Sequence, residues 1–193
     1  MQNTQTIPHK IVIVRSRRKT IAMTVRSDLT VEVRTPLYVS KAQIDEFLSE
    51  HSDWIDQNIA KLIRHRNEAE AAGILTKEDL DALAQKAAEL VPQRTAHFAK
   101  LIGVSYGRIT IRCQKTKWGS CSGKGNLNFN CLMMLMPPDV IDYLIVHELC
   151  HRKEMNHSPR FWAEVEKILP DYKIRVKWLR EHEGEIMMRI TRS

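Results

Sequence analysis

The sequence lacks both long apolar runs and paired cysteines, and each absence excludes a class of protein. No stretch approaches the roughly 20 apolar residues that a membrane-spanning helix needs, and the polar start Met1–Thr6 has no apolar run behind it that would serve as a signal peptide. Without a secretory signal, disulfides are not expected either. None of the cysteines forms a C-x-x-C pair, which argues against a zinc ribbon; they are Cys113, Cys121, Cys131 and Cys150. We therefore expect a cytoplasmic protein with no membrane partner.

The net charge is +7, from 30 Lys and Arg residues against 23 Asp and Glu residues. A basic surplus is compatible with an anionic partner such as nucleic acid, a nucleotide or an acidic peptide. Part of it is concentrated in Arg15–Lys19, where Arg17 and Arg18 lie at a predicted strand connection. These side chains could bind phosphate, although a solvated basic turn is the simpler interpretation. The oligomeric state stays open.

The centre of the candidate site is His147-Glu148-Leu149-Cys150-His151, with His157 following six residues later. Apolar residues recur before the motif at helical spacing, so we predict that it lies on a helix. On a helix, residues i and i+4 share a face, which aligns His147 with His151. Two imidazoles on one face are half of a zinc site, and a glutamate between them is the usual general base of a zinc hydrolase. HExxH also occurs by chance in helices, so the presence of a third ligand must decide whether this motif is a metal site.

The third ligand is predicted to be His157. Asn156 tolerates the left-handed conformation that ends helices, and Ser158 followed by Pro159 is typical of the start of a new helix. A sharp turn there would fold His157 back over the first two histidines. Three protein ligands with one open position are the pattern of catalytic zinc. The rival third ligand is a carboxylate on a following helix, and the candidates are Glu164, Glu166 and Glu181.

The first part of the chain is predicted to be a small antiparallel sheet followed by a helix. Three segments within residues 10–33 alternate between apolar and polar residues, and Ser27–Asp28 separates the last two as a turn. One helix should then begin after Ser40, an N-cap residue, and end at Gly73. We therefore expect an N-terminal lobe of antiparallel sheet plus helix over residues 1–72.

The second part, residues 73–193, is predicted to be the catalytic lobe of an α+β protein. Thr76 and Asp79 resemble a capping box at the start of a long helix that Gly103 ends, with a kink or break at Pro92. The segment Leu127–Met136 is predicted to be a strand. A strand directly before the metal-binding helix often forms the cleft rim in zinc proteases, where an extended peptide can pair with it.

The segment before this strand is rich in lysine, glycine and hydroxyl side chains, and we expect it to form an ordered loop that borders the active site. Its candidate substrate-binding residues are Lys117, Trp118 and Ser120, and Asn130 on the strand is another. For a peptide substrate, Trp118, Ser120 or Asn130 would donate a hydrogen bond to the developing oxyanion.

Several short motifs occur in order along the second part of the chain. Trp118-Gly119-Ser120-Cys121-Ser122 is followed by Gly125-Asn126-Leu127, Asn130 and Pro137-Pro138, and then by HExxH and Asn156-His157-Ser158. This combination resembles the YgjP-like metallopeptidase family of zincin-like proteins, and the basic turn near the N-terminus is also similar to that family's start. The resemblance implies a zincin-like catalytic lobe with zinc on His147, His151 and His157, and Glu148 as catalytic base.

We therefore predict a zinc-dependent hydrolase, most simply a metallopeptidase. Glu148 would take a proton from a zinc-activated water and return it to the leaving group. Proteins similar to this family have also been linked to hydrolysis of nucleoside triphosphates, UTP in particular, so a UTP pyrophosphatase is the alternative. That reaction needs several cations, and the candidates are Arg15, Arg17, Arg18, Lys115, Lys117 and Lys124. A non-catalytic zinc or nucleic-acid-binding module is a third possibility, with Cys121 completing a closed site.

Overall fold

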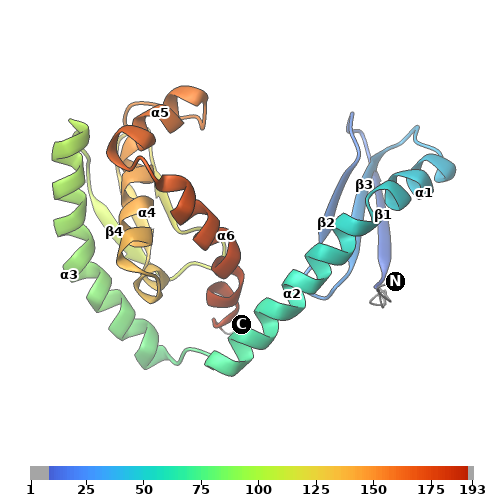
Figure 1. The fold of residues 1–193 in the computed structure, drawn as a ribbon, viewed down its shortest axis with the longest axis horizontal. Coiled ribbons are helices and arrows are strands. Elements are labelled where there is room, and N and C mark those ends of the chain that lie inside the picture. Colours follow the sequence, from blue (N-terminus) through green and yellow to red (C-terminus); the bar gives the residue numbers. More distant parts are fainter. Residues whose placement is uncertain (1–8, 191–193) are drawn as a thin grey trace. The chain divides into compact units, whose positions relative to one another are not determined.

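The computed structural model describes residues 9–190 (Figure 1). The chain divides into two compact units, residues 1–68 and 69–193, and the predicted α+β class is confirmed because both helices and strands occur in each unit. Among the described residues, no helix is both long and apolar enough to cross a membrane. The polar segment Met1–Thr6 lies outside the described range.

The first unit contains a sheet with the strand order β1-β3-β2, made of β1 (Ile11–Ser16), β2 (Ala22–Val25) and β3 (Val31–Pro36). Strands β2 and β3 form the antiparallel hairpin predicted around Ser27–Asp28, whereas β1 pairs with β3 in parallel. The prediction of a wholly antiparallel sheet is therefore wrong. Strand β2 occupies one edge of β3, and β1 pairs with the other edge. The prediction failed because apolar–polar alternation along a strand carries no information about the partner of that strand or its direction.

Two helices follow, α1 (Lys41–Glu50) and α2 (Ser52–Ala72). Ser40 caps α1 through a capping box, and Gly73, with φ of 79°, follows the end of α2. The single predicted helix is nevertheless interrupted at His51, where the backbone leaves helical geometry. The helices cover the buried side chains of β3, and the fully buried apolar residues of this unit are Val31, Val33, Ile44 and Ile59.

The second unit begins with the long helix α3 (Lys77–Ile102). Thr76 and Asp79 form the predicted capping box, and Gly103 ends the helix in the left-handed conformation with φ of 76°. Pro92 lies inside α3, which continues through it as one helix. The buried face of α3 packs into the main core of the unit, and such tertiary contacts supply most of the stability of a helix.

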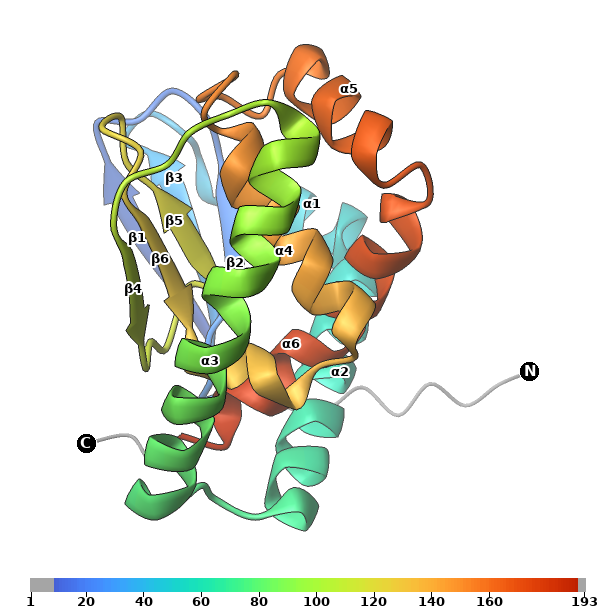
Figure 2. The same cartoon turned by 90° about the vertical axis from the view of Figure 1, so that its left-hand side faces the viewer.

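The second sheet has the order β4-β6-β5 and consists of β4 (Ile109–Arg112), β5 (Gly119–Cys121) and β6 (Leu127–Asn130). Strand β6 pairs with β4 in parallel and with β5 in antiparallel (Figure 2). The predicted strand Leu127–Met136 is too long, because the side chain of Asn130 accepts the N–H of Leu132 and starts a 3₁₀ helix over Cys131–Leu135. The predicted rim strand is therefore central, and β5 forms the edge.

Three further helices complete the second unit: α4 (Pro138–Cys150), α5 (Pro159–Ile168) and α6 (Tyr172–Met188). Helix α4 carries the HExxH motif and is apolar on nearly every side, because α3, α5, α6 and β5 all contact it (Figure 1). Arg94 of α3 donates two hydrogen bonds to Asp142 of α4, one of them over 2.7 Å between Nε and Oδ1. The side chain of Ser158 caps α5 by accepting a hydrogen bond from the N–H of Phe161.

Candidate metal centre and adjoining pocket

The three histidines singled out in the sequence lie together at the C-terminal end of α4. His147 is on the last turn of α4, His151 is its C-cap, and His157 directly precedes the N-cap of α5. One nitrogen from each ring lies within 4.8 Å of the other two, and Nε2 of His147 is 3.0 Å from Nε2 of His157. The turn between α4 and α5 thus folds His157 back over the other two rings.

Hydrogen bonds at Nδ1 orient the two histidines of the motif. Nδ1 of His151 is 3.1 Å from the backbone carbonyl oxygen of Glu154, and since a carbonyl only accepts, His151 carries its proton on Nδ1. Nδ1 of His147 is 3.4 Å from the hydroxyl of Tyr143, one helical turn earlier. Phe161 stacks on His151 with ring centroids 4.5 Å apart. Both rings therefore keep Nε2 for a metal ion, with their other nitrogen held by the protein.

Burial keeps these two histidines in the neutral form that binds metals. Desolvation lowers the pKa of His147 to about 3, and the neighbouring rings of His151 and His157 contribute to the shift. Desolvation also lowers the pKa of His151, against the effect of its hydrogen bond to Glu154. Neutral imidazole suits Zn²⁺, Cu²⁺, Fe²⁺ and Ni²⁺. The donor set fits such an ion, and the exposure of His157 leaves an approach for a further ligand.

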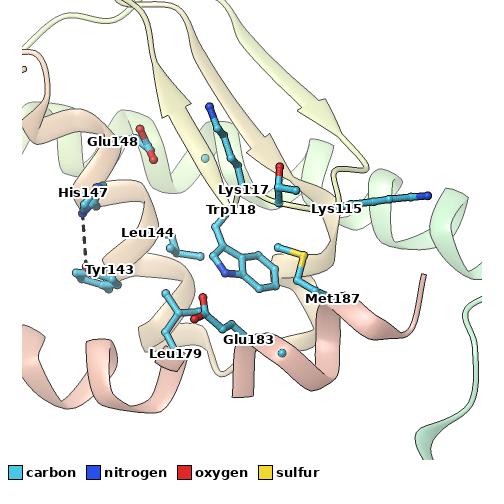
Figure 3. Close-up of a pocket in the computed structure, with 13 residues that line it drawn as sticks. Lys115, Lys117, Trp118, Tyr143, Leu144, His147, Glu148, Leu179, Glu183 and Met187 are labelled. Atoms are coloured by element: carbon cyan, nitrogen blue, oxygen red, sulfur yellow. Dashed lines mark hydrogen bonds between the residues drawn. The ribbon is translucent and has the colours of Figure 1, made fainter. Parts of the chain in front are cut away.

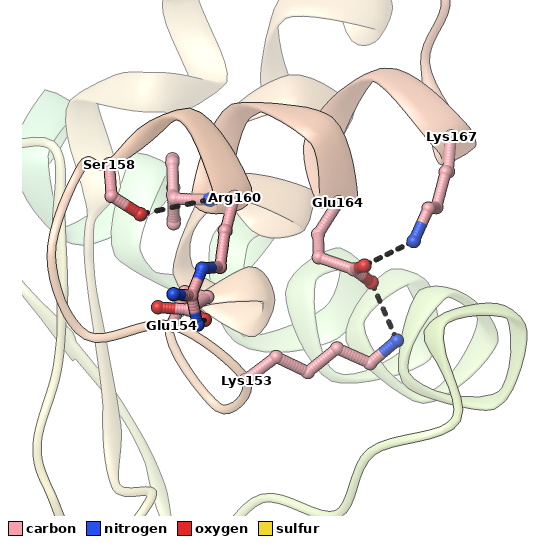
Figure 4. Close-up of polar contacts among 7 residues, drawn as sticks. Lys153, Glu154, Ser158, Arg160, Glu164 and Lys167 are labelled. Carbon is pink, nitrogen blue, oxygen red and sulfur yellow. Dashed lines mark hydrogen bonds and ion pairs between the residues drawn. The ribbon is translucent and has the colours of Figure 1, made fainter.

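The rival carboxylate Glu164 forms ion pairs with two lysines and does not belong to the histidine group. It forms an ion pair with Lys153 over 2.7 Å and another with Lys167 (Figure 4), and hydrogen bonds from these lysines lower the pKa of its carboxyl. Within the described part of the chain, the histidine group includes no carboxylate, so Glu166 and Glu181 stay outside it as well.

Neither Cys121 nor Cys150 belongs to the histidine group. The thiol of Cys121 is directed at the backbone carbonyl of Ser122. Cys150 is fully buried, and burial raises the pKa of its thiol to about 12. Residues 9–190 therefore form no closed site of four protein ligands around the histidines, which is the arrangement that a structural zinc module would need.

Glu148 is buried beside the histidines, with 6% of its surface exposed. Desolvation raises the pKa of its carboxyl to about 8, and the positive charge of Lys117 opposes the shift. The backbone of Gly119 passes so close that a Cβ atom placed there would lie 2.7 Å from Oε1 of Glu148. Strand β5 therefore runs directly past the Glu148 carboxyl group, and a side chain at position 119 would have to displace it.

Strand β5 pairs with β6 on one side only. The N–H of Asn130 donates to the carbonyl of Trp118, and the N–H of Ser122 donates to the carbonyl of Asn126. Hydrogen-bonded and non-hydrogen-bonded pairs alternate in an antiparallel ladder. The N–H and C=O groups of Gly119 and Cys121 therefore point away from β6, toward the outer edge of the sheet beside Glu148.

Three of the predicted substrate-binding residues lie close to this edge. Lys117 and Trp118 line a pocket that also includes Glu148. Ser120 lies on β5, and its hydroxyl oxygen accepts a hydrogen bond from the side-chain amide of Asn128. The hydroxyl hydrogen of Ser120 is thus left for another acceptor.

The other three predicted substrate-binding residues are placed differently. Asn130 is buried, and its amide hydrogens donate to the backbone carbonyls of Gln114 and Lys117. The side chain of Asn130 thus holds the loop before β5 in place. Both of its amide hydrogens are bound to that loop, so neither is available for the oxyanion role predicted from the sequence. Arg17 and Arg18 belong to the first unit, in the connection between β1 and β2.

A pocket of about 490 Å³ opens beside His147 and Glu148 (Figure 3). Its walls come from the loop before β5, from α4 and from α6. Sequence reasoning missed the contribution of α6, which supplies Leu179, Glu183, Gly184 and Met187. No local pattern links α6 to the motif, since they meet only through packing. It also missed Tyr143, which helical spacing before His147 could have revealed.

Replacing Gly119 with alanine is expected to lower turnover by about 100-fold without loss of the metal. The added methyl group must displace the buried Glu148 side chain, and a displacement of about 1 Å can cost this much in rate. The matched control is Gly123→Ala in the same hairpin, where a Cβ would meet nothing within 4 Å. Steady-state kinetics and metal content of both variants test this; equal activity of the two would contradict the close approach.

In the metal-free protein, stability is expected to fall on either side of about pH 5 to 6. The pKa of His147 is about 3 in the folded chain, against an ordinary value of 6.5. As the pH falls from 6.5 toward 3, the unfolded chain therefore takes up this proton before the folded chain does, and stability is lost. Glu148 has a folded pKa of about 8 against 4.5, so the unfolded chain loses the proton first and stability is lost as the pH rises. Between pH 6.5 and 8 this loss should be about 2 kcal/mol.

Urea denaturation of chelator-treated protein at several pH values measures this effect. Glu148→Gln removes the titrating carboxyl and should abolish the loss above pH 6.5. Identical pH profiles for the variant and the wild type would mean that Glu148 is not the group responsible.

One family of known proteins matches most of the chain. The family model, described as YgjP-like, metallopeptidase domain, matches residues 19–86 and 75–182, and it confirms the resemblance inferred from the motifs. Among proteins with a curated description, none matches.

Two solved structures of metallopeptidase zymogens are similar to about half of the chain. For abylysin of Pyrococcus abyssi, the identity is 25% over 49% of this chain and 96% of that one, with a TM-score of 0.44. For jannalysin of Methanocaldococcus jannaschii, the identity is 21% over 47% of this chain and 95% of that one, with a TM-score of 0.42.

Proposed function

This chain belongs to the YgjP-like family of metallopeptidase domains, and from that premise we propose that it hydrolyses peptide bonds with a zinc ion held by His147, His151 and His157. The observation that carries the proposal is the convergence of three imidazoles beside a buried carboxyl group at the edge of a sheet. Family membership makes the chain a metal-dependent hydrolase; zinc, the ligands and the peptide-binding mode are inferred here.

Zinc is the ion that the donor set favours. Three neutral imidazoles suit it, and three protein ligands leave a fourth position, the pattern of catalytic rather than structural sites. When bound, zinc supplies Lewis acidity that lowers the pKa of a water molecule and polarises the carbonyl group of the substrate. Tyr143 and the carbonyl of Glu154 would hold two of the rings in the orientation that the ion requires.

Glu148 is the proposed general base. Its carboxylate takes a proton from the attacking water and later returns it to the leaving amine. A nearby cation lowers the pKa of a carboxyl group. A bound metal ion would therefore lower the raised pKa of the Glu148 carboxyl group toward the pH at which the enzyme works. The backbone of Gly119 passes directly beside this side chain.

The outer edge of β5 is the proposed binding surface for the peptide backbone. The outward N–H and C=O groups of Gly119 and Cys121 would pair with an extended substrate, as in strand addition to a sheet edge. This places the scissile bond beside Glu148. Lys117 and Trp118, which line the pocket with Glu148, and Ser120 on β5 are the proposed donors to the developing oxyanion.

The alternative, a UTP pyrophosphatase, would need a cluster of cations around the site. Of the basic residues predicted for it, Lys115 and Lys117 line the pocket. Arg15 of the first unit donates to the backbone carbonyls of Leu37 and Val39 instead. Two lysines are few for a triphosphate, which needs several cations. The open edge of β5 can pair with an extended peptide, so we favour the peptidase.

Offering casein and UTP to the zinc-loaded full chain tests the proposal directly. Peptide fragments are followed by mass spectrometry and pyrophosphate release by a coupled assay, each with and without chelator. We expect chelator-sensitive cleavage of casein. Chelator-sensitive release of pyrophosphate with intact casein would overturn the peptidase in favour of the nucleotide hydrolase.

A further inference from the structure

Helix α6 presents a stripe of side chains to the pocket beside the metal centre. Leu179, Glu183 and Met187 recur every four residues, so they lie on one face of the helix, and all three line the pocket. Glu183 is exposed to solvent, whereas Leu179 and Met187 on either side of it are half-buried. Glu183 is therefore the charged residue of the stripe that a ligand entering the pocket can reach.

The walls around Glu183 are apolar and partly aromatic. Trp118 and Leu144 are buried, and they lie beside Leu179 and Met187 (Figure 3). Such walls suit a chain of methylene groups, and an indole ring also attracts cations. Gly184, the next residue of α6, adds no side chain that would fill the space.

Among the charged side chains that line the pocket, Glu183 is the one directed at the apolar walls. In Figure 3 the carboxylate of Glu183 points toward Leu144 and Trp118, whereas the ammonium groups of Lys115 and Lys117 extend away from them.

We propose that this pocket is a specificity subsite for a lysine or arginine side chain next to the cleaved peptide bond, with Glu183 as the residue that binds its cationic group. The apolar walls would contact the methylene stem, and the carboxylate would accept charge-assisted hydrogen bonds from the head group. The inference rests on the proposed peptidase function, and it names the substrate class of that same site.

Cleavage of a peptide library tests the subsite. Wild-type protein should prefer Lys or Arg on one side of the cleaved bond over Leu and over Glu. Glu183→Gln should lower kcat/KM for basic peptides by about tenfold, with little change for Leu peptides. Glu183→Lys should shift the preference to Asp or Glu. The control is Glu181→Gln on the same helix, which does not line the pocket. No basic preference in the wild type, or a preference unchanged in Glu183→Lys, would overturn the inference.

A binding measurement separates failure of the inference from failure of the proposed function. Fluorescence anisotropy with labelled Arg, Leu and Glu peptides on Glu148→Gln needs no turnover. Tighter binding of the Arg peptide that is lost in Glu148→Gln/Glu183→Lys supports the subsite even if no peptide is cleaved. Equal binding of the three peptides contradicts the subsite. If the wild-type protein nevertheless cleaves any of these peptides, the proposed peptidase function stands without the subsite.

Discussion

Glu148→Gln is expected to abolish turnover, with a loss of at least about 1,000-fold, while the metal stays bound. The amide has the size of the carboxyl but cannot take a proton from water, and general base catalysis contributes roughly 10² to 10⁴ in rate. Glu148 is not a member of the histidine group, so the ion should be retained. Cleavage of the best peptide substrate, together with zinc content by atomic absorption, measures both quantities.

The matched control for this variant is Glu154→Gln. The side chain of Glu154 pairs only distantly with Arg160, at 3.9 Å, while its backbone carbonyl is the part that contacts His151. The same chemical change a short distance away should therefore leave turnover nearly unaffected. Activity retained in Glu148→Gln would rule out Glu148 as the general base, and zinc lost from it would point to a ligand role instead.

His157→Ala is expected to weaken zinc binding by at least about tenfold and to remove activity with it. His157 supplies the one nitrogen of the group that lies outside the motif, and even residues behind the ligands typically change metal affinity by 10- to 100-fold. Competition with a chromogenic chelator measures the affinity. His97→Ala, an exposed histidine on α3 that contacts Phe98, serves as the control.

An unchanged affinity in His157→Ala would mean that a carboxylate completes the site. Glu164 would then have to leave its ion pairs with Lys153 and Lys167. Those pairs are partly exposed and individually weak, so the experiment decides between two arrangements that are both physically accessible.

Local signals were sufficient for several of the helix ends. Ser40, Thr76 and Ser158 are N-caps, and Gly103 is a left-handed helix end, as their side chains or lack of one predict. These features depend on hydrogen bonds within a few residues of the chain. The same reasoning places His147 and His151 one turn apart, because the spacing of a helix is independent of the rest of the fold.

Tertiary structure decided the features that depend on contacts between distant segments. The parallel pairing of β1 with β3, the edge position of β5 and the burial of Asn130 each depend on contacts with segments that lie elsewhere in the chain. The pocket needs α6 to lie against α4, more than 30 positions away. Hence the motif and the helix that carries it could be derived from the sequence by itself, since they rest on the periodicity of apolar residues along a short segment. The strand beside Glu148 and the wall that carries Glu183 arise only when the core closes, because close packing brings together residues that no local pattern connects.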